Sequence, residues 1–457
     1  MKENNSFCIV LKNWMLHAIL LLFTNHLHGQ DKQKNPDDKN TGFAIGIVPA
    51  LSYDSDLGLR VGGLAELFDY GNGERFPFYD HYLLLRITRS TKGSNINQML
   101  FDSEKLIKRV RIIGEASYLT EQALNFYGFN GYNSFFNPDV IDDRPDNEAY
   151  VSRLFYNHSR ELLRIRLDIQ PWLTHDRSLR LLAGLKYISI KTGGLDLDLL
   201  NRNQHESKHL PDVANLFDRY ANWGIIPEDQ KNGGNSWLLN TGIIYDTRNE
   251  ECYCTDGIWA ELVLKTAPAI ASNNSWSKII FSWRQYIDLI APSLTFAYRV
   301  SLQNKVYGEI PFYLLPFYYD SRLTEDGPGG GQNLRGVSRN RMVADGFAIA
   351  NLEVRRIVYS AYLFKQKADV AVSAFLDAGW ITQPYEFDIS GVTDSYGFSR
   401  EEHLNQLQYQ NSGIHMGAGP GLYLILNKNT VISVNYGLPL KNQDGNGGLY
   451  VGSGFLF

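Results

Sequence analysis

The fold is decided by residues 327–336, a loop whose sequence is Gly-Pro-Gly-Gly-Gly-Gln-Asn-Leu-Arg-Gly. On its N-terminal side, residues 294–302 alternate apolar and polar side chains, which predicts a β-strand. On its C-terminal side, residues 346–358 form a second expected strand that carries Glu353 on its polar face. A glycine-rich loop with one central arginine, Arg335, therefore connects two strands.

A third expected strand supplies another carboxylate. It contains Phe375, Asp377 and Gly379 in a Phe-x-Asp-x-Gly pattern, with Asp377 on the polar face. An arginine loop that faces inward carboxylates predicts a loop folded back into the lumen of a β-barrel. There Arg335 is desolvated and needs Glu353 and Asp377 as partners. The alternative is a solvated loop arginine, which is the rule in an ordinary loop.

Three motifs, in this order and strand context, resemble the BamA/TamA-type superfamily of outer-membrane insertases, also called the bacterial surface antigen family. They are Leu334-Arg335-Gly336 in the loop, Asn-Leu-Glu-Val-Arg in the following strand, and the Phe-x-Asp-x-Gly strand. In that family an (Ile/Val)-Arg-Gly-(Phe/Tyr) loop enters the barrel, and its arginine meets acids on the next two strands. The resemblance implies that Arg335 is the loop arginine and that Glu353 and Asp377 are its acids. Val337 departs from the pattern, because the family prefers an aromatic residue there.

The glycine run Gly329, Gly330 and Gly331 belongs to the same loop motif. It does not match a nucleotide-binding loop, because it lacks the Gly-Lys-Ser/Thr ending and the helix that phosphate binding needs. Glycine at these positions lets the backbone pass close to the lumen wall and adopt positive φ.

Composition and periodicity support a barrel. The chain has 457 residues, with 27 Tyr and 24 Phe, and this aromatic content suits strands and interfacial aromatic girdles. Its formal net charge of −5 gives no argument for binding nucleic acid. Alternation is clearest where an apolar face, Leu163, Ile165, Leu167 and Ile169, opposes a charged face, Arg164, Arg166 and Asp168. A lipid-facing wall around a wet lumen has this pattern, although a soluble sandwich can share it.

Loop lengths separate these two possibilities. About sixteen strand segments can be counted, an even number as in single-chain bacterial barrels. The long connections, at residues 120–150, 191–236, 317–345 and 382–412, all follow odd-numbered strands. Long loops at one end and tight turns at the other indicate an all-β, transmembrane antiparallel barrel with an inward-tucked sixth extracellular loop.

The expected domains are a signal peptide at residues 1–29, a short periplasmic linker at 30–41 and the outer-membrane barrel at 42–457. Family members that receive unfolded clients usually carry POTRA domains before the barrel, and residues 30–41 are too short for one. We therefore expect a barrel-only member whose receptor function, if present, belongs to a separate protein.

Two other motifs contain residue types that can bind metal or react. Residues 205–209, His-Glu-Ser-Lys-His, match a zinc-protease pattern, but polar flanks and Pro211 disfavour the helix that such a site needs. We interpret them as a solvated outer loop. Cys252 and Cys254 are interpreted as an incidental or strained disulfide in a turn, with no chemistry assigned.

The seam, where the first strand (residues 43–53) meets the last (449–457), is expected to be weak. Pro49 has no N–H for a ladder, and Gly452 and Gly454 weaken the last strand, which is expected to end on Phe457. A weak seam could part laterally to release a client strand into lipid. The alternative is that Pro49 lies beyond the paired stretch and the glycines merely relieve crowding.

These observations predict an outer-membrane protein of a Gram-negative-type bacterium, exported through a cleaved signal peptide. The resemblance implies that it assists insertion or translocation of proteins or lipid-linked clients, without enzymatic chemistry, cofactor or metal. Its expected partners are outer-membrane lipid and periplasmic or outer-membrane proteins. The alternative is a passive transport pore or surface-exposed binding barrel that retains the fold only.

Overall fold

The computed structural model describes residues 41–54, 58–270, 272, 274–291, 293–321, 327–363, 366–411, 413–427 and 430–457. The expected signal peptide and all of the expected linker except Thr41 lie outside the described residues. No helix within the described ranges is long and apolar enough to cross a membrane.

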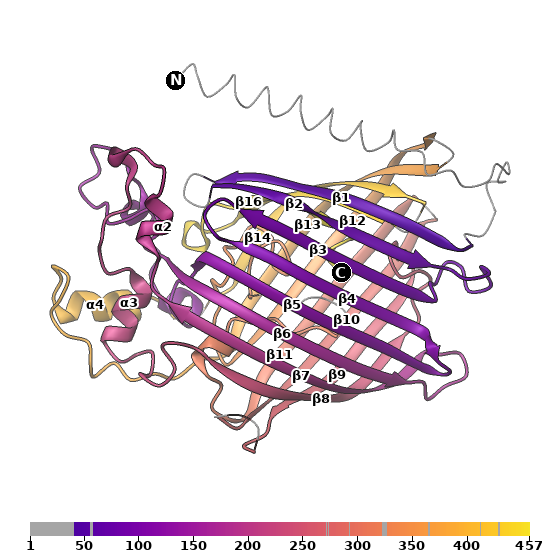
Figure 1. Ribbon diagram of the computed structural model, residues 1–457, viewed down its shortest axis with the longest axis horizontal. Helices are drawn as coiled ribbons and strands as arrows, with labels where there is room; N and C mark the ends of the chain where they lie inside the picture. The colour runs from indigo at the N-terminus through magenta and orange to yellow at the C-terminus, as the bar shows by residue number, and fades with distance from the viewer. Residues whose placement is uncertain are drawn as a thin grey trace.

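One antiparallel sheet of sixteen strands, ordered as in the sequence, forms the barrel wall and confirms the predicted fold class (Figure 1). The strands are β1 (Phe43–Asp54), β2 (Gly58–Asp69), β3 (His81–Ser90), β4 (Asn95–Ile107), β5 (Val110–Asn125), β6 (Asn157–Pro171), β7 (Leu179–Gly193), β8 (Gly234–Asp246), β9 (Gly257–Ala267), β10 (Trp276–Ile290), β11 (Leu294–Gly308), β12 (Gly346–Leu363), β13 (Gln366–Gln383), β14 (His415–Leu426), β15 (Thr430–Pro439) and β16 (Gly448–Ser453).

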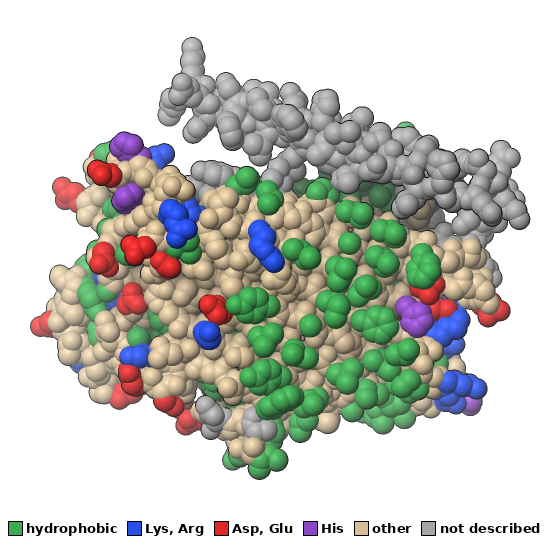
Figure 2. Space-filling view, in the orientation of Figure 1, with side chains coloured by type: hydrophobic (Ala, Val, Ile, Leu, Met, Phe, Trp, Pro, Cys, Tyr) green, Lys and Arg blue, Asp and Glu red, His purple; other side chains and the backbone are tan. Residues whose placement is uncertain are grey.

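Side-chain alternation along each strand separates lipid from lumen. On β6, Leu163, Ile165 and Leu167 are exposed, whereas Arg164 and Arg166 between them are buried. Figure 2 shows the exposed hydrophobic side chains as a band across the wall, with charged side chains mainly toward the two ends. An apolar band between polar rims is the surface that a bilayer requires.

The long connections lie at one end of the barrel, as predicted from their parity. They span residues 126–156, 194–233, 309–345 and 384–414, and their helices lie together beyond the strand ends in Figure 1. These loops contain the short helices α2 (Leu197–Asn201), α3 (Leu216–Asn222) and α4 (Arg400–Leu407) and the 3-10 turns η1 (Gly131–Asn133), η2 (Pro138–Ile141), η3 (Glu206–Lys208) and η4 (Phe312–Leu314). A further turn, η5 (Asn442–Asp444), precedes β16 at the same end.

Buried ion pairs lie in the lumen at its periplasmic end. Arg111 binds Asp102 through Nε–Oδ1 at 2.8 Å and Glu251 through Nη1–Oε1 at 2.8 Å. Arg248 binds Asp246 through Nε–Oδ1 at 2.9 Å. Glu251 and Arg248 belong to the β8–β9 turn, so this turn folds inward onto the strands. In the same turn, Cys252 and Cys254 are not bonded to each other, contrary to the expected disulfide.

The end of the chain differs from the expectation that the last strand reaches Phe457. The final strand stops at Ser453, and Gly454 turns the chain at φ 79°. Phe455 and Phe457 then point into the lumen, where the Arg355 guanidinium lies 4.0 Å from the Phe455 ring centroid and 5.3 Å from that of Phe457. Phe457 is 6% exposed and is therefore a lumen residue, not part of the seam. Packing and cation–π contacts inside outweigh the ladder bonds that a longer strand would make.

Candidate functional site

The sixth extracellular loop, residues 309–345, returns into the lumen and fixes Arg335 against the wall. The arginine is fully buried, at 0% exposure. Its Nε donates to Asp377 Oδ2 at 2.9 Å and its Nη2 to Asp377 Oδ1 at 3.1 Å, a two-pronged contact. Its Nη1 donates to Glu353 Oε2 at 3.0 Å. The structure thus brings together the three residues that the sequence predicted as a group.

Aromatic and amide groups complete this contact, which we call the loop anchor and define as Arg335, Glu353, Phe375 and Asp377. The guanidinium lies 3.6 Å from the ring centroid of Phe375, the aromatic residue of the strand motif. The backbone N–H of Arg335 also donates to Asp377 Oδ2, at 2.9 Å. Glu353 Oε1 accepts from the Tyr423 hydroxyl at 2.6 Å. Asp377 therefore holds both the side chain and the main chain of Arg335.

The electrostatic balance favours the ionised arginine. Burial disfavours its charge, but the carboxylates of Asp377 and Glu353 more than offset this and raise the pKa of Arg335 above its ordinary value. One cation between two carboxylates would leave a net negative charge, which Arg355 reduces by donating through Nε to Glu353 Oε1 at 3.3 Å. Buried charges that are paired and hydrogen-bonded in this way are costly to break singly.

Asn333 folds the loop into its compact shape. Its Oδ1 accepts from Gly329 N at 2.7 Å, and its Nδ2 donates to the carbonyl of Gly327 at 2.7 Å. Its own carbonyl accepts from Asn351 Nδ2 at 2.8 Å and from Arg299 Nη2 at 3.2 Å. Positive φ at Gly329 (109°) permits the tight turn that these bonds close. One asparagine thus joins the loop to itself and to the wall.

Glycines let the loop backbone lie directly on the strands. At Gly336, φ is 92°, and an added Cβ would lie 2.7 Å from the carbonyl oxygen of Leu438. A Cβ on Gly417 would lie 2.0 Å from the carbonyl oxygen of Arg335, and one on Gly437 would lie 2.5 Å from Gly336 N. The wall under the Arg-Gly motif therefore has to be glycine as well.

The remaining motif residues pack around this contact. Leu334 and Val337 are fully buried in a cluster with Met342 and Phe347. Valine at the family's aromatic position therefore still serves as a core residue. A Cβ on Gly379 would meet Met342 Sδ at 2.7 Å, and one on Gly331 would meet the Tyr450 ring at 2.6 Å. Gly330 N donates to the carbonyl of Val337 at 2.8 Å.

Sequence reasoning missed several residues that hold the loop. They include Asn333, Tyr423 and Tyr450, whose hydroxyl accepts from Gly336 N at 3.1 Å. Tyr423 and Tyr450 occupy inward positions in the alternating patterns of β14 and β16, and this could have indicated that they face the lumen. Their specific partners depend on which distant strands lie next to the loop in the folded barrel, and a local sequence pattern does not contain this information.

The seam is the second predicted feature. Each strand pairs with the next through backbone hydrogen bonds, but among the described residues no such pairing joins β1 to β16. Pro49 is exposed on β1 and lies opposite Gly63 of β2, so it falls within a paired stretch on that side. Gly452 lies opposite Ser433 of β15.

The two edges nevertheless approach each other. A Cβ on Gly46 of β1 would lie 3.5 Å from Thr430 Cβ and 2.7 Å from Thr430 Oγ1, on β15. At this periplasmic end β16 has already stopped and its tail has turned inward, so β1 lies against β15. Among the described residues, the Thr430 side chain lies against Gly46 there, without backbone pairing between the two strands.

The zinc-like segment forms no helix with two imidazoles on one face. Residues 206–208 form the 3-10 turn η3. His205 Nδ1 lies 2.9 Å from Ser207 Oγ, and His209 Nε2 lies 3.3 Å from the carbonyl oxygen of Gln204. Within the described part of the chain, no group of three or more His, Cys, Asp or Glu side chains is placed to hold a metal ion.

A family model, the Omp85 superfamily domain, matches residues 129–457. The chain belongs to the Omp85 superfamily. This confirms the insertase-type resemblance and makes the molecule an outer-membrane barrel of a Gram-negative bacterium.

Two solved structures are similar to this chain. BamA from Haemophilus ducreyi lacking POTRA domains 1-3 is 15% identical, with 94% of this chain and 74% of that chain covered and a TM-score of 0.48. CdiB from Escherichia coli is 12% identical, with 90% and 61% covered and a TM-score of 0.50. No curated protein matches the sequence.

Proposed function

We propose that this Omp85 barrel assists the insertion or translocation of a polypeptide, or of a lipid-linked client, at the outer membrane. The observation that carries the proposal is that the described residues of β1 and β16 do not pair, in a sheet whose other neighbouring strands do. We infer that a periplasmic or outer-membrane protein delivers the client and that the barrel contributes no covalent chemistry.

An unpaired strand edge presents a row of backbone N–H and C=O groups that a second chain can add to as a strand. Within a bilayer such groups cost several kcal/mol each when unsatisfied, so an incoming strand gains much by pairing there. The exposed apolar residues of β1, including Phe43, Ile45 and Ile47, place this edge against lipid. A client strand that pairs with β1 therefore enters the membrane as it folds.

The pore alternative receives less support from the lumen. A passive pore needs a water-filled channel, whereas the sixth loop and its buried partners occupy the lumen at the level of Arg335. The inward tail at Phe457 and the buried pair of Arg111 with Glu251 narrow the periplasmic end. The residues that fill the lumen therefore favour a function at the barrel wall, such as client insertion at the seam, over conduction through the lumen.

A disulfide across the seam tests the proposal. Gly46→Cys with Thr430→Cys places the two Cβ atoms about 3.5 Å apart, within the range of a disulfide. The background carries Cys252→Ser and Cys254→Ser. The purified protein in liposomes receives a urea-unfolded small outer-membrane barrel, and its folding is followed by heat-modifiable mobility on gels. We expect the wild-type protein to accelerate folding of the client barrel. The variant with the oxidised disulfide should lose this acceleration, and reduction of the disulfide should restore it.

The matched control is Ala350→Cys with Ala378→Cys, which joins directly opposed residues of the firmly paired β12 and β13. Its oxidation should leave folding of the client unchanged. If the oxidised seam variant accelerates folding as well as the reduced form, the seam is not the site of insertion. Steady conductance of wild type alone in planar bilayers would favour the pore.

A further inference from the structure

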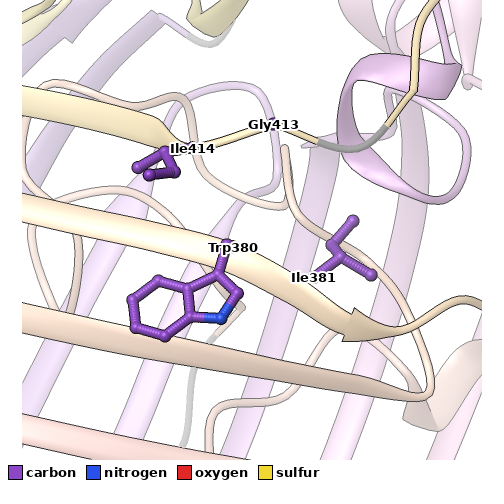
Figure 3. A pocket seen from close by; sticks show the side chains of 4 residues that line it. All are labelled: Trp380, Ile381, Gly413 and Ile414. Atoms are coloured by element: carbon purple, nitrogen blue, oxygen red, sulfur yellow. The ribbon is translucent and has the colours of Figure 1, made fainter.

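A pocket of about 320 Å³ opens on the outer wall near the extracellular end of β13 and β14. It is lined by Trp380, Ile381, Gly413 and Ile414, which Figure 3 shows on the two sides of the gap between these strands. Trp380 is 36% exposed and Ile414 is 53% exposed on the lipid-facing side, while Ile381 is buried. The volume falls at the small end of ligand-sized clefts, which span roughly 300–1,000 Å³.

The pocket exists because β13 and β14 diverge. Their last cross-strand pair at this end is Gly379 with His415, yet β13 continues to Gln383. Over these extra residues β13 keeps its pairing with β12 on the other side, where Gly346 lies opposite Gln383. Within the described part of the chain, no residue of β14 pairs with residues 380–383, and an apolar gap remains beside them in the wall.

A cation stands beside the gap. A Cβ on Gly413 would lie 3.8 Å from Lys441 Nζ, and this ammonium lies 4.7 Å from the ring centroid of Tyr132. Lys441 is exposed and forms no ion pair with a carboxylate that the structure describes. The neighbouring acid, Asp444, is buried and already accepts from the Tyr132 hydroxyl at 2.7 Å and contacts His415 Nδ1 at 2.5 Å.

We propose that this crevice binds one acyl chain of an anionic, phosphate-bearing membrane lipid, with the headgroup held by Lys441. Apolar walls that face the bilayer select a hydrocarbon chain, because lipid is the medium in contact with them. A lysine at the rim favours a negatively charged headgroup directly above that chain. The site lies on the β13–β14 wall, and the proposal does not depend on client insertion at the β1–β16 seam.

Native mass spectrometry of the full chain in mild detergent tests the site, with phosphatidylglycerol and phosphatidylcholine of identical acyl chains as probes. We expect one tightly retained lipid and a preference of about fivefold for phosphatidylglycerol, the contribution of one cation at a membrane surface. Ile414→Trp fills the pocket and should abolish the retained lipid. Lys441→Gln should keep the lipid but lower the preference to about one.

Two matched controls separate the site from general lipid contact. Leu422→Trp changes an equally lipid-exposed residue farther along β14, at 50% exposure, and should retain the lipid. Lys208→Gln removes another exposed lysine of the outer loops and should keep the preference. Heat-modifiable mobility verifies folding of each variant, and Ile414→Phe provides a second filling variant. Lipid retention by both filling variants, an unchanged preference in Lys441→Gln, or retention of detergent only would each overturn the proposal.

Discussion

The wall that carries the loop anchor and the wall that contains the seam are built in opposite ways. β12 and β13, which supply Glu353 and Asp377, are each 18 residues long and paired along their length. β16 is 6 residues long, and none of its described residues pairs with β1. Among the described strands, the barrel thus places the two acids of the loop anchor on the longest pair and its unpaired edge on the shortest strand. A wall can part at one junction only when another region keeps the cylinder in shape.

One arginine connects the two regions. Arg355 donates to Glu353 of the loop anchor at 3.3 Å, and its guanidinium lies 4.0 Å from the ring of Phe455 in the tail beyond β16. Its Nη2 also donates to the carbonyl oxygen of Phe457 at 3.4 Å. The tail therefore contacts an arginine that is bonded to the same carboxylate that holds the sixth loop.

The largest expected effect comes from breaking the loop anchor. Arg335→Ala leaves Asp377 and Glu353 buried without their main cation, at a cost of ~3–5 kcal/mol. We expect the heat-resistant band on gels to melt at lower temperature and the sixth loop to become sensitive to protease. Arg339→Ala is the control, because that side chain is 29% exposed and its partner on β5, Glu121, keeps Arg160 as a second cation. Equal heat and protease resistance of Arg335→Ala and wild type would refute the anchor's structural role.

A smaller change in stability is expected when a glycine of each region is replaced by alanine. Gly336→Ala forces a positive φ on a residue with a Cβ and a contact of 2.7 Å to Leu438 O, so it should destabilise the barrel by about 1–3 kcal/mol. Gly452→Ala meets only Ser433 Oγ at 3.6 Å and should stiffen β16, stabilising it by about 0.5–1 kcal/mol. Urea titration of the two variants measures both. A stability loss in Gly452→Ala comparable to that in Gly336→Ala would show that the seam is as tightly packed as the anchor.

The smallest effect on stability is expected from probes of topology. Single cysteines at the exposed Asn203, in a long loop, and Asp176, in a short turn, should leave the barrel as stable as the Cys252→Ser and Cys254→Ser background. A membrane-impermeant maleimide should label Asn203→Cys on intact cells and Asp176→Cys only after the outer membrane is opened. Labelling of both on intact cells would contradict the orientation derived from loop lengths.

Local sequence information was sufficient to predict the strands of the barrel wall and the side chains that face lipid. Alternation with a period of two is a property of neighbouring residues, so Leu163 to Ile169 predicted which side chains face lipid. The alternating segments predicted about sixteen strands, and the parity of the long connections predicted that they lie at one end. The Arg-Gly motif and the two acidic strand motifs predicted which residues meet, because their order along the chain determines neighbouring strands.

The sequence by itself thus determined the barrel, the common end of its long loops and the partners of Arg335, since each depends on strand order and periodicity. Only the tertiary structure decided that Phe457 leaves the wall, because the lumen offers Arg355 and aromatic neighbours that lie far away in the chain. It also decided that Gly417 and Gly437 must be glycine, since the need arises where the sixth loop lies on strands that are distant in the sequence. Close packing between distant segments depends on the whole closed cylinder, and no stretch of sequence contains it.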